Sequence, residues 1–365
     1  MYFKDLYLEH FRNYNEENWQ PTPHLNVLHG ENGQGKTNLL EAMQILTLGH
    51  SPRARKDREL IAFSASGCRL KGEIQAGDRH LLLTFTLGEG KKSHLLNQLS
   101  FSQGLQFAQK PAVVFFSPTD LRLVQGAPAF RRRYLDQILI QVYPTYREGL
   151  YRYWRGLTQR NALLREIRAR RAAIALLSAW DEEIAESGAR ITMARSKATG
   201  ELAIHLSRIS ATLSETRIDL EYRAGSGSFE NGKINLREIW EKTRGEDLAR
   251  GITTHGPHRD DLSLVLNGRE AGTYGSQGQQ RTLALGMRLA EITWLEERMS
   301  RRPILLLDDV FSELDPGRRR RLIALLSGEG QVMLTCTDLG QLPTEVASRG
   351  ENFRVENGKI YGREG

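Results

Sequence analysis

Apolar and polar positions alternate loosely over residues 1–11, a pattern that predicts a strand. A short apolar run at 25–28 predicts a second, buried strand, which ends in a glycine-rich loop. From Lys36 the spacing changes to that of a helix with one apolar face, formed by Leu39, Leu40, Met43 and Leu46. The N-terminal segment is therefore predicted to run strand, loop, strand, loop, helix.

Strand patterns continue over residues 68–74 and 81–87, on either side of a turn, and over the apolar run 113–116. Residues 130–213 differ, because they have almost no strand pattern, very little glycine or proline, and apolar positions at helical spacing. We expect two long helices that fold back on each other, with the turn in the arginine-rich stretch 165–171. These helices form either an ordinary helical subdomain or a protruding arm.

Strand character returns at 218–222, and after the loose segment 224–228 a compact pattern of strands and helices runs to the C-terminus. The chain is therefore predicted to be an α/β protein whose main domain is formed by two separate sequence segments, with a mainly helical insertion between them. We place the halves at residues 1–119 and 253–365. The insertion, with a short antiparallel helical arm, is placed at 120–252.

One octapeptide carries recognisable chemistry: Gly30-Glu31-Asn32-Gly33-Gln34-Gly35-Lys36-Thr37 fits the phosphate-loop pattern G-x-x-x-x-G-K-[ST]. It follows an apolar strand and opens a helix, where backbone N–H groups cradle phosphate oxygens. All eight residues are therefore candidates for nucleotide binding. Lys36 adds a point charge near the β- and γ-phosphates, and the Thr37 hydroxyl can ligate Mg²⁺. The alternative is a chance glycine turn, which the order strand, loop, helix disfavours.

The partner of a phosphate loop is an apolar strand that ends in an acid, and residues 304–309 supply one. Asp308 would hold Mg²⁺ directly or through water, and Asp309 is placed to orient or deprotonate the attacking water. Adjacent acids after a buried strand could instead cap the next helix or turn. The phosphate loop favours the metal role.

Lys36 and Asp308 lie 272 residues apart. In a compact GTPase or kinase the two motifs would lie much closer in sequence. A large insertion between them is typical of an ABC-type, SMC-like ATPase head. Such a P-loop NTPase needs a signature loop that reaches the ATP held by a second copy, and residues 275–281 open a helix that suits this task. The candidate contacts are Ser276, Gly278 and Gln279. Residues 311–315 are similar to the D-loop that lines the dimer seam.

The order of these motifs resembles the RecF family, SMC-like recombination mediators of bacterial DNA repair. The resemblance spans the whole chain, and GPHRDDL at 256–262 together with SQGQQR at 276–281 is highly specific. The other matching segments are FRNY at 11–14, GENGQGKT at 30–37, 51–61, FSPTDL at 116–121, 126–133, LLLDDVFSELD at 305–315 and TCTD at 335–338.

The resemblance implies further contacts. Arg12 and Asn13 would lie near the nucleotide, toward adenine or the α-phosphate, and Arg55 would lie beside the phosphates, although a histidine is expected in this loop. His258 and Arg259 would lie on the face that approaches DNA or the ATP seam. For each of these residues the alternative is a surface salt bridge or a core histidine with its hydrogen bonds satisfied.

One departure from general ABC heads follows the last core strand. Thr337 and Asp338 stand where a histidine would touch the γ-phosphate. The resemblance therefore implies a weak, DNA-stimulated ATPase that uses ATP and Mg²⁺ and forms an ATP-dependent homodimer. It also implies RecR and RecO as partners, loading of RecA at gaps or junctions of single- and double-stranded DNA, and links to replication and the SOS response.

Charge changes this picture little. The chain has 365 residues, with 51 Lys and Arg against 44 Asp and Glu, and the net charge of +7 permits contact with phosphates without requiring it. Basic clusters at 131–133, 165–171 and 318–321 are usually solvated surfaces, although duplex binding needs several such residues on one face. Because no motif for reading base edges is present, we expect DNA binding to be independent of sequence.

Other features bear on location and on rival functions. Cys68 and Cys336 are far apart, no run approaches the ~20 apolar residues of a membrane helix, and acids stand near the start, so we expect a cytoplasmic protein. The ATPase subunit of a membrane transporter predicts an LSGGQ-like signature and a switch histidine, which are missing. An SMC-type chromosome organiser predicts hundreds of heptad residues, whereas 130–213 has 84 positions.

Overall fold

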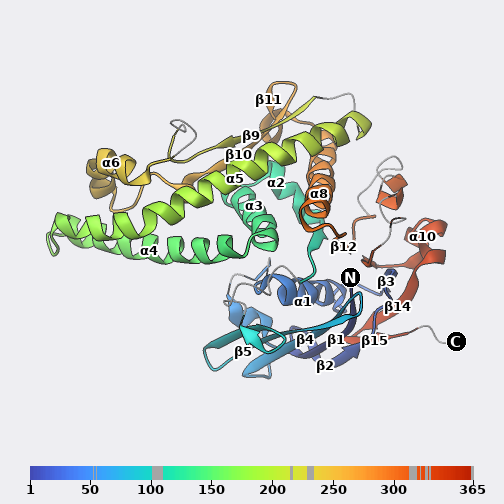
Figure 1. Ribbon diagram of the computed structural model, residues 1–365. Helices are drawn as coiled ribbons and strands as arrows, with labels where there is room; N and C mark the ends of the chain where they lie inside the picture. Colours follow the sequence, from blue (N-terminus) through green and yellow to red (C-terminus); the bar gives the residue numbers. More distant parts are fainter. Residues whose placement is uncertain are drawn as a thin grey trace. The chain divides into compact units, whose positions relative to one another are not determined.

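A computed structural model describes residues 1–51, 53–54, 56–100, 110–213, 217–227, 234–311, 319–320, 322–324, 328 and 330–362. The chain divides into two compact units. Unit 1 comprises Met1–Asp120 and Glu291–Gly365, and unit 2 comprises Leu121–Ala290. Figure 1 follows the elements of each unit along the chain.

Unit 1 contains a six-stranded sheet in the order β15-β14-β3-β13-β12-β8, in which all neighbours except β15 and β14 are parallel. Its strands are β3 (Leu25–His29), β8 (Val113–Phe116), β12 (Ile304–Asp308), β13 (Val332–Cys336), β14 (Glu351–Glu356) and β15 (Lys359–Tyr361). The central strands are almost entirely buried, which explains their unbroken apolar runs. Because β13 lies between β3 and β12, the phosphate loop and the acid pair follow strands that flank one common neighbour.

The second sheet of unit 1 is antiparallel, in the order β2-β1-β4-β5-β6-β7. Its strands are β1 (Tyr2–Phe11), β2 (Tyr14–Trp19), β4 (Gly67–Ala76), β5 (Arg79–Gly88), β6 (Lys91–Leu96) and β7 (Leu99–Ser100). Helix α1 (Lys36–Leu48) contacts strands of both sheets and buries eleven of its thirteen residues. One hydrophobic core therefore joins the two sheets through α1.

Unit 2 is mainly helical with a small antiparallel sheet in the order β11-β10-β9. Its elements are α2 (Leu121–Gln125), α3 (Pro128–Val142), α4 (Pro144–Arg168), α5 (Leu177–Leu213), β9 (Ile218–Arg223), α6 (Leu236–Arg250), β10 (Asp261–Leu266), β11 (Arg269–Glu270), α7 (Ala271–Tyr274) and most of α8 (Gln277–Met299). Shorter elements of the chain are the 3-10 helices Asp57–Leu60, Pro118–Asp120, Ile174–Leu176, Pro257–Arg259 and Leu339–Gln341, and α10 (Thr344–Arg349).

The predicted strands at 1–11, 25–28, 113–116 and 218–222 are confirmed. The two long helices expected to fold back on each other are α4 and α5, and the turn between them begins after Arg168, within the expected stretch 165–171; helix α3, which was not expected, precedes them. Pro144 ends α3 and opens α4 at a position where its missing N–H costs nothing. Helices α4 and α5 run side by side as an antiparallel pair (Figure 1).

The boundary between the units differs from the predicted domain division on one side only. Unit 1 ends at Asp120, one residue from the predicted 119, but the chain returns to it at Glu291 rather than at 253. Strand β10 explains the difference, because it pairs along its whole length with β9 and so holds residues 261–266 to the insertion. The first division remains a prediction about functional lobes.

A buried ion cluster holds the helical part of unit 2 together. The Arg160 guanidinium on α4 is fully buried and donates hydrogen bonds of 2.6 Å to Asp181 Oδ1 on α5 and 2.7 Å to Asp247 Oδ2 on α6. Its carbon CZ also lies 5.0 Å from the ring centroid of Trp240. Three helices thus meet at one cation.

We predict that Arg160→Ala lowers the free energy of unfolding by about 3–5 kcal/mol, because the buried Asp247 loses its counter-charge and Asp181 keeps only Arg244, 3.6 Å away. Urea unfolding followed by circular dichroism measures the change. Arg155→Ala, an exposed position on the same helix, is the control and should change stability by less than about 0.5 kcal/mol. Equal stabilities of the two variants would contradict a structural role for the cluster.

Candidate nucleotide-binding site

The loop between β3 and α1 requires glycine at its two ends. Gly30 has φ +148° and Gly35 has φ +120°, both in the region that side chains rarely adopt. A Cβ atom on Gly30 would lie 2.3 Å from the carbonyl oxygen of Val355. A Cβ atom on Gly35 would lie 2.8 Å from Nδ2 of Asn13 and 2.9 Å from the hydroxyl of Tyr14. Residues from two distant segments therefore fix the path of the loop.

The same neighbours hold the loop through its carbonyl oxygens. The Gln34 carbonyl accepts from Asn13 Nδ2 at 2.9 Å and from the Gly358 N–H at 3.0 Å, and the Gly35 carbonyl accepts from the Tyr14 hydroxyl at 3.1 Å. In a trans peptide the N–H points away from the carbonyl of the same unit. The N–H groups of Gly35 and Lys36 are therefore directed away from these braces, as a phosphate cradle requires.

Lys36 occupies the position that the motif predicts. Its Nζ donates to the carbonyl oxygens of Gly30 and Glu31, the latter at 2.8 Å. Burial lowers the pKa of this ammonium group, while Cys336, Asp309 and Asp308 act in the opposite direction. The two carbonyl groups are neutral, so a phosphate bound at the loop would supply the negative charge that the Lys36 ammonium group lacks there.

Asp308, the last residue of β12, contacts Thr37 in the first turn of α1. Its Oδ1 accepts from Thr37 Oγ1 at 2.7 Å and from Thr335 Oγ1 at 2.9 Å. Burial raises the pKa of Asp308, and the two hydroxyl hydrogen bonds oppose the rise. A hydroxyl and a carboxylate at one point are hard oxygen donors that fit Mg²⁺, which takes few protein ligands beside phosphate and water.

Asp309 has different surroundings from its neighbour. It adopts φ +49°, and its backbone N–H donates to Thr335 Oγ1 at 2.9 Å. Thr335 thus contacts both acids, and the sequence analysis gave it no role at the site. It lies opposite Asp308 in the parallel register of β13 and β12, a pairing that only the structure reveals.

A buried carboxylate behind the loop was also missed. Glu41 on α1 is fully buried and forms a two-point pair with Arg12, at 3.0 Å to Nε and 2.9 Å to a terminal nitrogen. It also accepts from the Ser51 hydroxyl, and Arg53 lies 3.6 Å away. These contacts tie the loop that follows α1 to the helix that carries Lys36 and Thr37.

This cluster bears on the contacts that family resemblance implied. The Arg12 guanidinium is engaged by Glu41 and by the Glu59 carbonyl at 2.8 Å, and Asn13 braces the phosphate loop through the Gln34 carbonyl. Their placement near the nucleotide stays a prediction. Arg55 and residues 312–315 of the D-loop lie outside the described residues.

The signature loop lies in unit 2, at the start of α8. The Ser276 N–H donates to Gln279 Oε1 at 2.9 Å, and the Gln279 N–H donates to Ser276 Oγ at 3.3 Å. This reciprocal pair is a capping box, and Ser276, Gly278 and Gln279 are exposed. Gln280, which was not among the predicted site residues, is buried and holds the loop in place. Its side-chain amide donates to the carbonyl oxygens of Ala271 and Gly272 at 2.9 and 3.1 Å.

The GPHRDDL segment is largely structural. His258 is bonded at both ring nitrogens, 2.7 Å from the Tyr153 hydroxyl and 3.0 Å from the Thr253 carbonyl, and burial lowers its pKa to about 4. Asp260 is fully buried and accepts from Arg195 at 3.0 Å, as well as from the Tyr222 hydroxyl. His258 thus fits the core-histidine alternative, while Arg259 is exposed.

A phosphate loop after one parallel strand, an acid after a nearby strand, and a large insertion before it define an ABC-type, SMC-like ATPase head. A family model described as an AAA domain matches residues 5–126. An Smc head domain from Pyrococcus furiosus is similar in fold, with a TM-score of 0.51 and 15% identity over 99% of this chain and 96% of that one.

Curated relatives give the family. The DNA replication and repair protein RecF of Heliobacterium modesticaldum is 39% identical over 99% of both chains, and that of Bacillus subtilis is 34% identical over 99% of this chain and 100% of its own. A solved structure of the recombination mediator protein RecF-ATP in the RecFOR pathway has a TM-score of 0.90 and 31% identity, covering 99% of this chain and 97% of that one. The chain belongs to the RecF family of DNA replication and repair proteins.

The expected family and fold class are thus confirmed, including the SMC-like architecture. Among the helices of the described part of the chain, none has the length and apolar character needed to cross a bilayer.

We predict that Lys36→Ala weakens ATP binding by roughly 10- to 100-fold, because a charge-assisted contact is worth about 1.5–3 kcal/mol. Isothermal titration calorimetry measures the change, and circular dichroism should show an unaltered fold. Lys91→Ala removes an exposed lysine of the same unit and should bind ATP as the wild type does. Unchanged affinity in the Lys36 variant would remove the phosphate-loop assignment.

Proposed function

We propose that this protein is an ATP-dependent DNA-binding recombination mediator. The observation that carries the proposal is the 2.7 Å hydrogen bond between Thr37 and Asp308, which joins two motifs 271 residues apart behind a braced phosphate loop. The cofactor-binding residues would be 30–37, with Arg12, Asn13 and Arg55 near them, and Thr37 and Asp308 would hold Mg²⁺. Relatives solved as RecF-ATP and RecF-ATPrS support the choice of nucleotide.

Hydrolysis would take place at a site shared by two copies. Lys36 binds the β- and γ-phosphates, and Asp309 orients the attacking water. Ser276, Gly278 and Gln279 of a second copy would donate to the γ-phosphate, for which their exposure and the helix N-terminus suit them. The bound magnesium would offset the phosphate charge. ATP would thereby hold two copies together as a homodimer.

The turnover should be slow. Asp338 is exposed and accepts from the Gly340 N–H at 2.8 Å, in the loop where related heads carry a histidine. A carboxylate at this place cannot donate to a phosphate and would repel one. We expect DNA to raise this weak activity.

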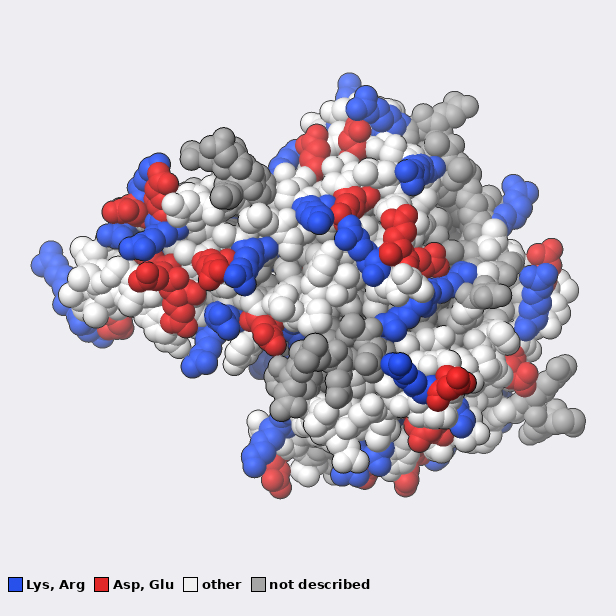
Figure 2. All heavy atoms as spheres, in the orientation of Figure 1, with Lys and Arg blue, Asp and Glu red and all other residues white. Residues whose placement is uncertain are grey.

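DNA would be bound through phosphates and shape rather than sequence, at gaps or junctions between single and double strands. On the face shown in Figure 2, cations and anions are interspersed rather than gathered in one basic patch. That face alone offers no cluster of cations, and pairing of two copies would accumulate more phosphate contacts. We propose RecR and RecO as partners in loading RecA, in the cytoplasm, in support of gap repair, replication and the SOS response.

Sedimentation velocity with and without ATP, at two salt concentrations and with duplex added, tests this function. We expect an ATP-dependent dimer that binds duplex more weakly at high salt. A monomer under every condition would contradict the shared site, and a dimer that ignores DNA would contradict the DNA role.

We predict that Asp309→Asn still binds ATP but hydrolyses it about 10²- to 10⁴-fold more slowly, since a positioned base is lost while the metal ligand remains. The ATP-bound dimer should then accumulate in sedimentation. Asp308→Ala is the comparison and should weaken Mg²⁺-dependent binding itself. Loss of nucleotide binding in Asp309→Asn would mean that the two roles are misassigned.

We predict that Ser276→Arg retains ATP binding as a monomer and fails to dimerise, because a bulky side chain enters the seam without touching the protein's own phosphate loop. ATPase activity should fall by about 10²- to 10³-fold, the usual cost of one lost transition-state donor. Ser207→Arg adds the same charge at an exposed site on α5 and should behave as the wild type. A Ser276→Arg protein that still sediments as an ATP-dependent dimer would refute the shared site.

A further inference from the structure

Helix α4 has two sharply different faces. Its buried residues, which face the rest of unit 2, are Tyr146, Tyr153, Gly156, Leu157, Arg160, Leu164 and Ile167. The opposite face carries a band of side chains in which most neighbours are three or four residues apart, so that they share one side of the helix. This outer stripe consists of Tyr151, Trp154, Arg155, Thr158, Ala162 and Arg165.

The outer stripe exposes two aromatic rings. Tyr151 is 70% exposed and Trp154 is 44% exposed, and they stand three residues apart. Exposed large aromatic side chains next to each other are uncommon on a surface without a function. Arg155 and Arg165 lie on the same side of the helix, so the stripe begins with the two rings and continues with two guanidinium groups over about 21 Å at 1.5 Å per residue.

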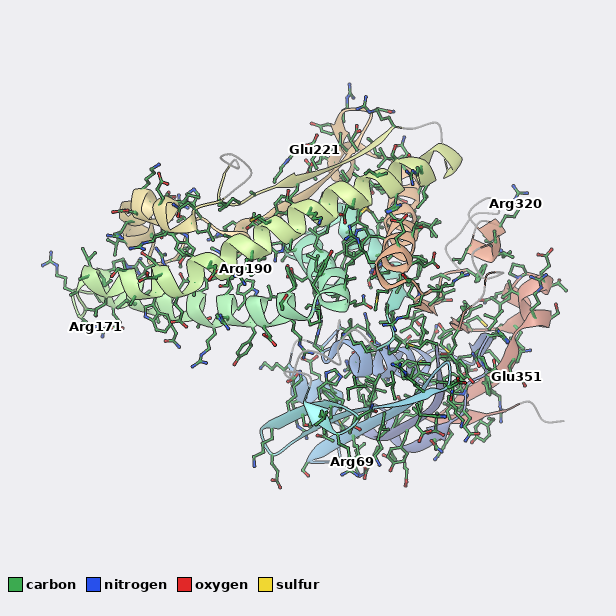
Figure 3. All side chains as sticks on the ribbon, viewed as in Figure 1. Arg69, Arg171, Arg190, Glu221, Arg320 and Glu351 are labelled. Atoms are coloured by element: carbon green, nitrogen blue, oxygen red, sulfur yellow. The ribbon has the colours of Figure 1, made fainter. Side chains whose placement is uncertain are left out.

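Arginines on α4 and α5 differ in whether a carboxylate pairs with them, and the two stripe arginines share the unpaired state with Arg152 and Arg168 of the described part of α4. Arg155 and Arg165 form no ion pair with any described residue, whereas Arg171 pairs with Glu166 at 2.9 Å and Arg190 with Glu186 at 2.5 Å. Figure 3 shows Arg171 in the turn between α4 and α5, and Arg190 on α5. Helix α4 as a whole has six arginines against two glutamates. The charge of the stripe is therefore positive and available.

We propose that the outer stripe of α4 binds an unpaired DNA strand, with bases stacked on Tyr151 and Trp154 and phosphates on Arg155 and Arg165. Stacking on aromatic side chains together with cationic contacts to the backbone is the usual way in which proteins hold single strands regardless of sequence. A duplex hides the faces of its bases and would leave both rings unused. The proposal rests on the proposed DNA function and deepens it, because it assigns the single-stranded side of a junction to a particular helix.

Fluorescence anisotropy of the full-length protein with labelled oligothymidylate, and with the same strand annealed to its complement, tests this assignment. We expect Trp154→Ala and Tyr151→Ala each to weaken single-strand binding by about tenfold or more, as loss of one stacked base does. Duplex binding, ATP binding and thermal unfolding should not change. Trp154→Phe keeps a stacking surface and should recover most of the lost affinity.

The charged part of the stripe has its own readout and control. Arg155→Gln should make the slope of log affinity against log salt shallower by about 0.7, the share of one single-strand phosphate. Arg190→Gln, which removes an arginine already paired with Glu186, should leave the slope unchanged, and Phe63→Ala removes a fully exposed ring of unit 1 as the aromatic control.

The outcomes separate this proposal from the function on which it rests. A wild-type protein that binds neither strand nor duplex would overturn both. Wild-type affinity for the single strand in Trp154→Ala and Tyr151→Ala, with duplex binding intact, would overturn the stripe alone and would assign the rings to contact with another protein.

Discussion

The hydrogen bond between Thr37 and Asp308 depends on three adjacent parallel strands. Strand β13 lies between β3 and β12 and brings Thr335 to the same point, so that one carboxylate accepts two hydroxyl groups at 2.7 and 2.9 Å. Parallel strands must be joined by long connections, and such a connection can be of almost any length without changing how the strands pair. The chain can therefore leave unit 1 at Asp120, form all of unit 2, and return at Glu291 without disturbing the site.

The phosphate loop is shaped by segments far from it in sequence. Asn13 and Tyr14 come from the turn between β1 and β2, and Gly358 from the turn before β15. Glu41 adds a second anchor by holding Arg12 to α1. Each sheet thus supplies one turn that holds carbonyl groups of the loop, β1–β2 from the antiparallel sheet and β14–β15 from the other, and together they direct the loop's N–H groups toward one side.

The sequence predicted those parts of the fold that produce a recognisable pattern among neighbouring residues. Residues 30–37 and 304–309 have fixed patterns, and the strands at 25–28 and 113–116 are unbroken apolar runs. Glu41, Thr335 and Gln280 produced no such pattern, because a polar residue on a helix or at a strand end looks solvated until its partner is known. The pairing of β10 with β9, which joins residues 261–266 to unit 2, is likewise a long-range contact that no periodicity records.

The orientation of α4 is set by charge as much as by packing. An apolar face alone would let the helix rotate slightly on α5, since Leu and Ile side chains accept several arrangements. Arg160 does not, because a buried guanidinium is costly unless both Asp181 and Asp247 reach it, at 2.6 and 2.7 Å. Only one rotation of α4 satisfies all three groups. That rotation also turns Tyr151 and Trp154 outward, so the buried cluster on one face determines which side chains the other face can offer to a ligand.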